Sequence, residues 1–287
     1  MPEAERQNPS AGPDDRKFRK RAARWGGALV VTACAGFIGH RLAALDPGQL
    51  AAQASWPLAG AMVAAPCLFA LSDKLLSNAW SVLAAATEKL GSRQVDALYG
   101  RGVLAKYLPG SVFQYASRQV EGAAAGLPHG TLAKASVTEI ALHLPASMIA
   151  AGISVVIAGL PSLGGAALAG AAFLALRAKA TLVRAGSLQL CAFACFAASA
   201  ALVGAALLPA GAPLGLFAAL FLMAWLAGFL VPVAPGGLGV REAALLALAG
   251  SQFAPGPLLA CVLALRIASI LGDVLFGAIA LLRARRT

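Results

Sequence analysis

Eight apolar runs occupy most of this 287-residue chain and leave few folds open to it. Hydrophobic residues make up 59% of the sequence and charged residues only 12%. A soluble domain needs far more charged side chains on its surface, so the composition predicts an all-α integral membrane protein. Read with a membrane-sized window, the runs cover residues 25–45, 57–86, 133–158, 163–176, 186–208, 213–231, 238–250 and 257–282.

The Lys and Arg residues predict how the chain is oriented. Most of them lie in the amino-terminal tail, in the connections 87–132 and 177–185 and after residue 282, whereas the alternate connections contain none. By the positive-inside rule, the basic connections and both termini face the cytoplasm. We therefore expect a basic disordered tail over 1–24, a polytopic domain of the cell membrane over 25–283 and a cytoplasmic tail over 284–287. The net charge of +11 is a determinant of topology, not a nucleic-acid footprint.

A helix break interrupts the apolar runs near residue 235. Pro235 has no amide proton, and Gly236 and Gly237 permit positive φ, so one helix must end and another can begin near Leu238. The run 238–250 would extend only about 20 Å as a helix, against about 30 Å of hydrocarbon. Because both termini are expected on one side, this run must complete a crossing. We expect about eight crossings, one of them broken, with a polar cavity at the break.

A second break, Pro109-Gly110, follows Lys106 and precedes a helical pattern. Polar side chains recur there at i, i+3, i+7 and i+10, namely Ser111, Gln114, Arg118 and Glu121. One polar face on an otherwise apolar helix predicts a re-entrant or interfacial helix. Two broken elements in the two halves of a chain are typical of transporters built from repeated units. The alternative, that this Pro-Gly pair only turns a loop, stays open.

Two apolar runs carry polar stripes at helical spacing. The stripes are Glu139, His143 and Ser147 on one run, and Arg266, Ser269 and Asp273 on the last. Ionisable groups at membrane depth cost several kcal/mol unless they are paired or hydrated, so they normally face a bundle interior or a watery path. Two compatible roles remain open: charge coupling during transport, and structural pairing in which Glu139 binds an Arg such as Arg241 or Arg266.

Arg241 and Glu242 are neighbours about 100° apart around a helix, so each needs its own partner. Glu242 in a first turn suits the helix dipole, but Arg241 does not. A cation beside free helix-start amides predicts an anion site for a lipid phosphate or carboxylate. We take Arg241, Arg118 and Lys106 as candidate headgroup ligands. The alternative for Arg241 is a side chain that reaches the anionic membrane surface.

The segments VAPGGLGVREAA (233–244) and KYLPGSVFQ (106–114) resemble the transmembrane region of the lysylphosphatidylglycerol synthase and flippase family. The resemblance extends from about the second run to the end of the chain and implies a stand-alone flippase-like domain protein. Glu139 and Arg266 match recurrent polar positions of that family. Its synthases add a soluble aminoacyl-transferring domain, which this sequence lacks, so we expect no lysylation of lipid.

These features predict a flippase or transporter for a phospholipid or a lipid-linked glycan. We expect no cofactor, no metal and no Walker A site, and membrane lipids as the partners, with a biosynthetic enzyme as a possible further one. Two alternatives stay open: an integral-membrane transferase, with Glu139 and His143 as its acid and base, or an accessory subunit that binds lipid without moving it.

Overall fold

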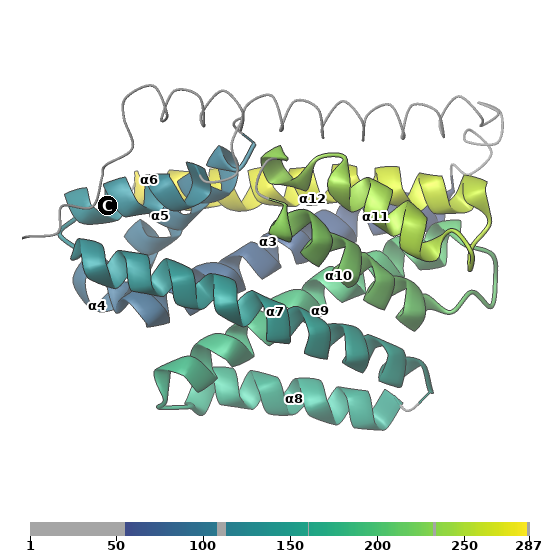
Figure 1. Ribbon diagram of the computed structural model, residues 1–287, viewed down its shortest axis with the longest axis horizontal. Helices are drawn as coiled ribbons and strands as arrows, with labels where there is room; N and C mark the ends of the chain where they lie inside the picture. Colours follow the sequence, from purple (N-terminus) through teal and green to yellow (C-terminus); the bar gives the residue numbers. More distant parts are fainter. Residues whose placement is uncertain (1–54, 108–112, 160, 232–233, 286–287) are drawn as a thin grey trace, which may run out of the picture.

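The computed structural model describes residues 55–107, 113–159, 161–231 and 234–285, which form helices and turns without a strand (Figure 1). The expected tail over 1–24, the first apolar run, Pro109, Gly110 and the last two residues lie outside this part. The helices are α3 (Trp56–Ala84), α4 (Ala86–Leu90), α5 (Ser92–Ala105), α6 (Phe113–Ala124), α7 (His129–Gly159), α8 (Pro161–Arg177), α9 (Thr181–Leu207), α10 (Leu214–Leu230), the 3-10 turn η1 (Pro235–Gly237), α11 (Val240–Ala249) and α12 (Pro255–Ala284).

Four of these helices are long and apolar enough to cross a membrane: α3, α7, α9 and α12. The shortest of the four has 27 residues, or about 40 Å of helix at about 1.5 Å per residue, which exceeds a hydrocarbon core of about 30 Å. The chain is therefore an all-α multi-pass membrane protein. Helices α8 and α10 have 17 residues each and α11 has ten. The expected total of about eight crossings stays a prediction.

Large apolar side chains cover the outer faces of α7 and α8. Val137, Met148, Phe173 and Leu176 are all exposed there. Helix α8 lies at the periphery, in contact with α7 and α9 (Figure 1). A contiguous apolar surface of this kind would be unstable in water and suits contact with lipid.

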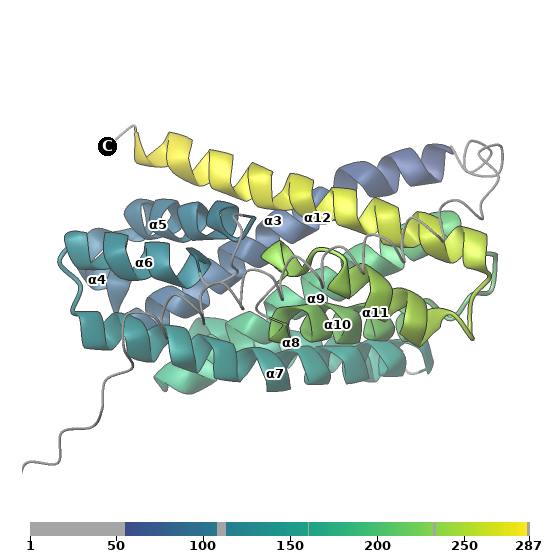
Figure 2. The ribbon, with the colours of Figure 1, turned by 45° about the horizontal axis from the view of Figure 1, so that its top comes forward.

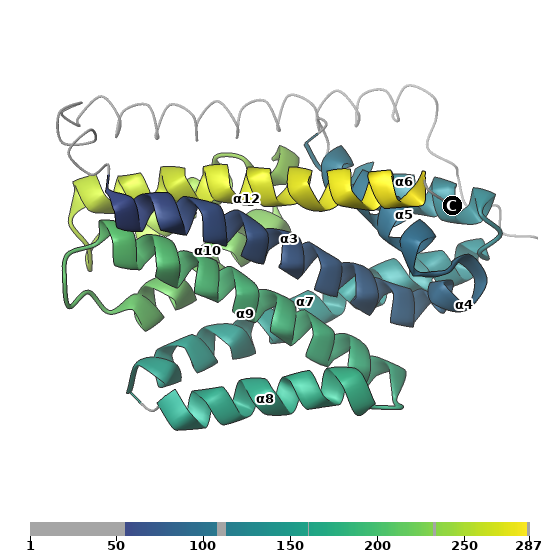
Figure 3. The ribbon, with the colours of Figure 1, turned by 180° about the vertical axis from the view of Figure 1, so that it is seen from behind.

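The main core lies between α3, α9, α10 and α12, where Phe69, Phe193 and Phe217 are fully buried. Helix α3 lies between α12 and α9 in Figure 3 and packs against both. The contact between α3 and α12 depends on Gly272. A Cβ at this position would lie 2.4 Å from Phe69 Cβ and 2.8 Å from the Pro66 carbonyl oxygen. Only hydrogen fits there.

Three short helices, α4, α5 and α6, pack together at one end of the bundle beside the carboxyl-terminal half of α12 (Figure 2). Gly102 of α5 faces α6, and a Cβ there would lie 3.0 Å from the Gln114 carbonyl oxygen. This close approach lets α6 lay its polar face against α5 and α7. The segment predicted to be an interfacial or re-entrant element is thus a folded helical layer that covers one end of the bundle.

We predict that Gly272→Ala lowers the free energy of unfolding by about 1–3 kcal/mol, because the added methyl group forces α3 and α12 apart. Gly60→Ala is the matched control, since nothing lies within 4 Å of a Cβ at that position of α3. Thermal unfolding in detergent compares the two. Equal melting temperatures for both variants would contradict the close packing described here.

Candidate functional site

The connection between α10 and α11 forms the helix break that the sequence predicts. Helix α10 ends at Leu230, Pro235–Gly237 forms a single 3-10 turn, and α11 begins at Val240. The φ angles of Gly236 and Gly237 are +56° and +70°, in the left-handed region that residues with a Cβ rarely adopt. The chain can therefore turn within a few residues, and α11 packs against α10.

Glu242 closes the start of α11 and ties it to α12. Its Oε2 accepts a hydrogen bond of 2.7 Å from the Gly239 amide, which satisfies one of the free donors at the helix start. Its Oε1 lies 3.4 Å from Arg266 Nε. Arg266 also donates to the Gly236 carbonyl oxygen at 3.3 Å, and Ser269 donates back to the Arg266 carbonyl at 2.9 Å. The last span thus holds both sides of the break.

Arg241 is held in place by shape and by an aromatic ring. Its guanidinium lies 5.0 Å from the centroid of the Trp225 ring, in cation–π geometry. Its stem passes between two glycines: a Cβ on Gly228 would lie 2.3 Å from Arg241 Cγ, and one on Gly237 would lie 2.5 Å from Nε. The buried Nε has no hydrogen-bond partner in the described part of the chain. Arg241 is thus positioned but not neutralised by a contacting carboxylate.

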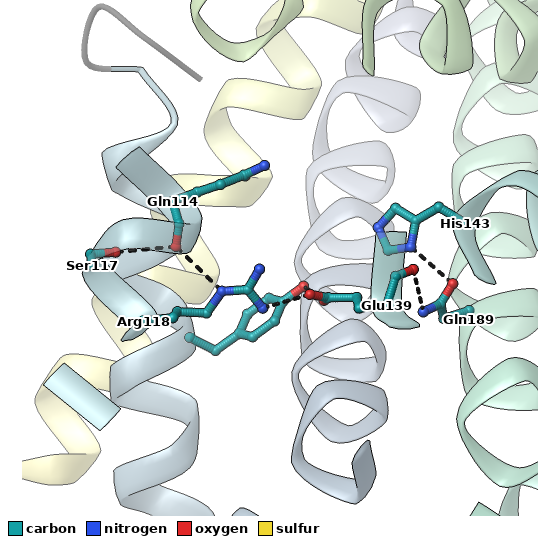
Figure 4. Close-up of polar contacts among 7 residues, drawn as sticks. Gln114, Ser117, Arg118, Glu139, His143 and Gln189 are labelled. Carbon is teal, nitrogen blue, oxygen red and sulfur yellow. Dashed lines mark hydrogen bonds and ion pairs between the residues drawn. The ribbon is translucent and has the colours of Figure 1, made fainter. Parts of the chain in front are cut away.

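Arg118 and Glu139 form a buried ion pair between α6 and α7 (Figure 4). Arg118 Nη1 lies 2.8 Å from Glu139 Oε2, and the side chains are only 5% and 1% exposed. Tyr99 donates a hydrogen bond of 2.8 Å to the other carboxylate oxygen. The guanidinium also lies within 6 Å of three aromatic rings, those of Trp80, Tyr99 and Tyr115. Both charges are therefore satisfied inside the protein.

His143 lies one turn beyond Glu139 and faces an aromatic group. Its Nδ1 is 2.9 Å from Gln189 Oε1, while Gln189 Nε2 donates to the Glu139 carbonyl at 3.2 Å (Figure 4). The imidazole packs 5.1 Å from the Phe229 ring, which stacks on Trp225 at 5.2 Å. This layer joins the Glu139 stripe to the aromatic ring under Arg241.

Lys106 and Tyr107, at the end of α5, both contact Asp273 of α12. Lys106 Nζ lies 2.8 Å from Asp273 Oδ2, and the Tyr107 hydroxyl donates to the same oxygen. Burial, together with the nearby Asp273 carboxylate, raises the pKa of Tyr107, so its hydroxyl stays protonated and remains a donor. Asp73 of α3 is buried beside this group.

A cavity of about 360 Å³ lies between these groups. Its walls come from α3, α5, α6, α7, α9, α10, the break and α11. A smaller cavity of about 30 Å³ adjoins it at Trp225 and Arg241 and reaches Glu242, Arg266 and Ser269. The larger volume falls within the range of small-molecule sites, about 300–1,000 Å³. Its polar wall consists of Asp73, Lys106, Gln114, Arg118, His143 and Arg241.

The structure brings the described site residues into neighbouring groups, with one correction. Glu139 does pair with an Arg, as the structural alternative expects, but the partner is Arg118 and not one of the examples Arg241 and Arg266, because α6 lies against α7. Arg118 and Lys106 line the cavity, but their charges already contact Glu139 and Asp273. The second predicted break lies outside the described residues.

Several site residues were not recognised in the sequence: Tyr99, Tyr115, Gln189, Trp225, Gly228 and Phe229. Aromatic side chains in apolar runs look like ordinary core residues, and nothing in the sequence brings Tyr99 of α5 to Glu139 of α7. One signal was available, because Gln189 is the only amide side chain in the run 186–208. A lone amide in a crossing helix needs a buried partner.

No protein-family model matches this chain, and no curated protein is significantly similar to it. The resemblance to the flippase family therefore stays a prediction. Within the residues that the structure describes, no three His, Cys, Asp or Glu side chains gather into a metal-binding group. The function is argued below from the cavity and its charges.

We predict that Glu139→Gln lowers the free energy of unfolding by about 3–5 kcal/mol, because it leaves the buried Arg118 charge unpaired. Arg118→Met combined with Glu139→Gln should recover much of this loss, since both charges are then gone. Denaturant titration in detergent measures the effect.

The matched control is Glu121→Gln, which breaks the more exposed pair of Arg101 and Glu121, whose charged atoms are 2.5 Å apart. It should cost no more than about 1 kcal/mol. If Glu139→Gln were as mild as Glu121→Gln, the Arg118–Glu139 pair would not have the structural role assigned to it.

Proposed function

We propose that this protein moves an amphiphile with an anionic headgroup, a phospholipid or a lipid-linked glycan, between the two leaflets of the membrane. The headgroup enters the cavity of about 360 Å³ and binds Arg241. The alkyl chains remain in the hydrocarbon of the bilayer.

The observation that most supports this proposal is that Arg241 lines the cavity without an ion-pair partner among the described residues. Of the cations that line the cavity, Lys106 and Arg118 contact carboxylates, whereas Arg241 makes no ion pair with any described residue. A cation in a low-dielectric site without an anion in contact is destabilised by several kcal/mol. A cation–π contact of about 0.5–2 kcal/mol offsets only part of this. An anionic headgroup would supply the remaining stabilisation of the Arg241 charge. It would lie near the amino-terminal end of α11, where the helix dipole also favours negative charge.

The rim of the cavity favours an amphiphile over a soluble anion. Two of the side chains that line it, Ile140 of α7 and Leu230 of α10, are also exposed on the outer surface, by 37% and 63%. The cavity thus reaches the lipid-facing side between α7 and α10. A lipid at this opening would place its headgroup among the polar side chains of the cavity and its alkyl chains in the apolar bilayer.

The sequence motifs support the same proposal. The resemblance to the synthase and flippase family, carried by the segments around Pro235 and Lys106, implies lipid translocation. We also propose, from the distribution of Lys and Arg, that the protein lies in the cell membrane with both termini in the cytoplasm.

Arg241→Ala is expected to reduce protein-dependent leaflet exchange of an anionic lipid by about 10- to 100-fold. Loss of a hydrogen bond to a charged group costs about 1.5–3 kcal/mol, and about 1.4 kcal/mol corresponds to tenfold. The measurement follows trace fluorescent phosphatidylglycerol, or a fluorescent polyprenyl phosphate, in vesicles of phosphatidylcholine, with a membrane-impermeant quencher outside.

Arg177→Ala is the matched control, because Arg177 is exposed at the end of α8. It should exchange both probes at the parental rate. Equal rates in empty and protein-containing vesicles for both anionic probes would refute translocation. Saturable binding of a probe without exchange would instead identify a lipid-binding subunit.

Gly228→Ala should reproduce the defect while leaving every charge in place. The new methyl group would lie 2.3 Å from Arg241 Cγ and must displace the side chain from the cavity. Gly152→Ala is the control, since nothing lies within 4 Å of a Cβ at that position of α7. Parental exchange by Gly228→Ala would show that the position of Arg241 is unimportant.

A further inference from the structure

Two carboxyl groups from different spans meet at the edge of the cavity. Asp73 of α3 and Asp273 of α12 are only 4% and 5% exposed, and Asp73 lines the cavity wall. Lys106 contacts Asp273 and lines the same cavity as Asp73, which places both carboxyl groups at one end of the cavity. Two adjacent carboxylates repel each other strongly when both are ionised and buried.

The hydrogen bonds of the two groups are unequal. Asp273 has Lys106 Nζ at 2.8 Å and the hydroxyl of Tyr107 on the same oxygen. Asp73 Oδ2 is fully buried and has no hydrogen-bond partner among the described residues. An ionised carboxylate only accepts hydrogen bonds, so the carboxylate of Asp273 cannot satisfy that of Asp73. Asp73 Oδ2 therefore lacks a donor in the structure, and it is the atom at which a proton can bind.

The other charges near Asp73 do not provide this donor. Lys106 contacts Asp273 and makes no hydrogen bond to Asp73 Oδ2. Several other titratable groups on the helices packed against α3 are engaged elsewhere: Tyr99 with Glu139, Asp96 with Lys74, His143 with Gln189 and Arg266 with Glu242. Cys191 and Cys195 of α9 are thiols.

The formal charges around the cavity indicate when the proton binds. Arg118 is balanced by Glu139, and Lys106 by Asp273. Arg241 and Asp73 are left over, one positive and one negative, on the walls of the same cavity. While the cavity is empty these two charges balance. An anion bound to Arg241 leaves Asp73 as an uncompensated buried charge, which protonation removes.

We propose that Asp73, paired with Asp273, is a proton-binding site that takes up one proton when an anionic headgroup binds Arg241, so that lipid and proton cross together. The proton bonds to Asp73 Oδ2, and the resulting hydroxyl donates to Asp273. The proton returns to water when the headgroup leaves. This inference rests on the proposed function and adds an energy source to it, the proton gradient.

The test uses the whole protein in phosphatidylcholine vesicles that contain trace fluorescent phosphatidylglycerol and a trapped pH dye. One proton per singly charged lipid means that a gradient of one pH unit shifts the leaflet distribution about tenfold toward the alkaline side. Exchange should also carry protons in a ratio near one to one. In Asp73→Asn, where the amide cannot bind the proton, the bias and the number of protons carried per lipid should fall to zero, whatever rate of exchange remains.

Asp96→Asn is the matched control. Asp96 Oδ1 lies 2.7 Å from Lys74 Nζ, and Asp96 does not line the cavity. This variant should keep both the bias and the proton flux, as should Asp73→Glu. If the parent protein exchanged lipid without a proton flux, the coupling would be overturned but the proposed function would stand. This measurement on the parent tests the coupling even if Asp73→Asn does not fold. Retention of the flux by Asp73→Asn would also overturn it. Absence of any exchange in the parent would overturn the proposed function and the coupling with it.

Discussion

The proposed function depends on one arginine, Arg241, which the fold encloses without a carboxylate of the described residues in contact with it. Buried charges in a membrane protein are normally paired, and Arg118–Glu139, Lys106–Asp273 and Arg266–Glu242 follow that rule. Arg241 does not. Its stem fills a slot between two glycines, and its guanidinium lies over Trp225 beside a cavity. The guanidinium of Arg241 is therefore held where an anion that enters the cavity can pair with it.

The helix break makes this arrangement possible. A continuous helix from α10 into α11 would satisfy its own backbone and leave no turn for a side chain to fill. The break instead starts a new helix at the cavity and places Arg241 in its first turn. Glu242 and Arg266 then stabilise the break from the other side. The fixed charges of the spans thus serve two purposes: most hold the helices together, and Arg241 and Asp73 remain available at the cavity.

Much of this arrangement could be predicted from the sequence, because it depends on local patterns. Apolar runs gave the all-α membrane class, Pro235 and its glycines gave the break, and helical spacing gave the buried stripe from Glu139 to Ser147. The pairing of charges could not be predicted, since it depends on which helices pack side by side. Arg118 meets Glu139 only because α6 lies against α7. Aromatic residues such as Trp225 were missed because their spacing does not distinguish a ligand platform from core packing.

The most direct test of the central claim is a density map of the protein in lipid nanodiscs that contain phosphatidylglycerol. The account predicts density for a phosphate group within hydrogen-bonding distance of the Arg241 guanidinium, with the lipid chains leaving between α7 and α10. A map in which a protein carboxylate contacts Arg241, and side chains fill the cavity without lipid density, would contradict it.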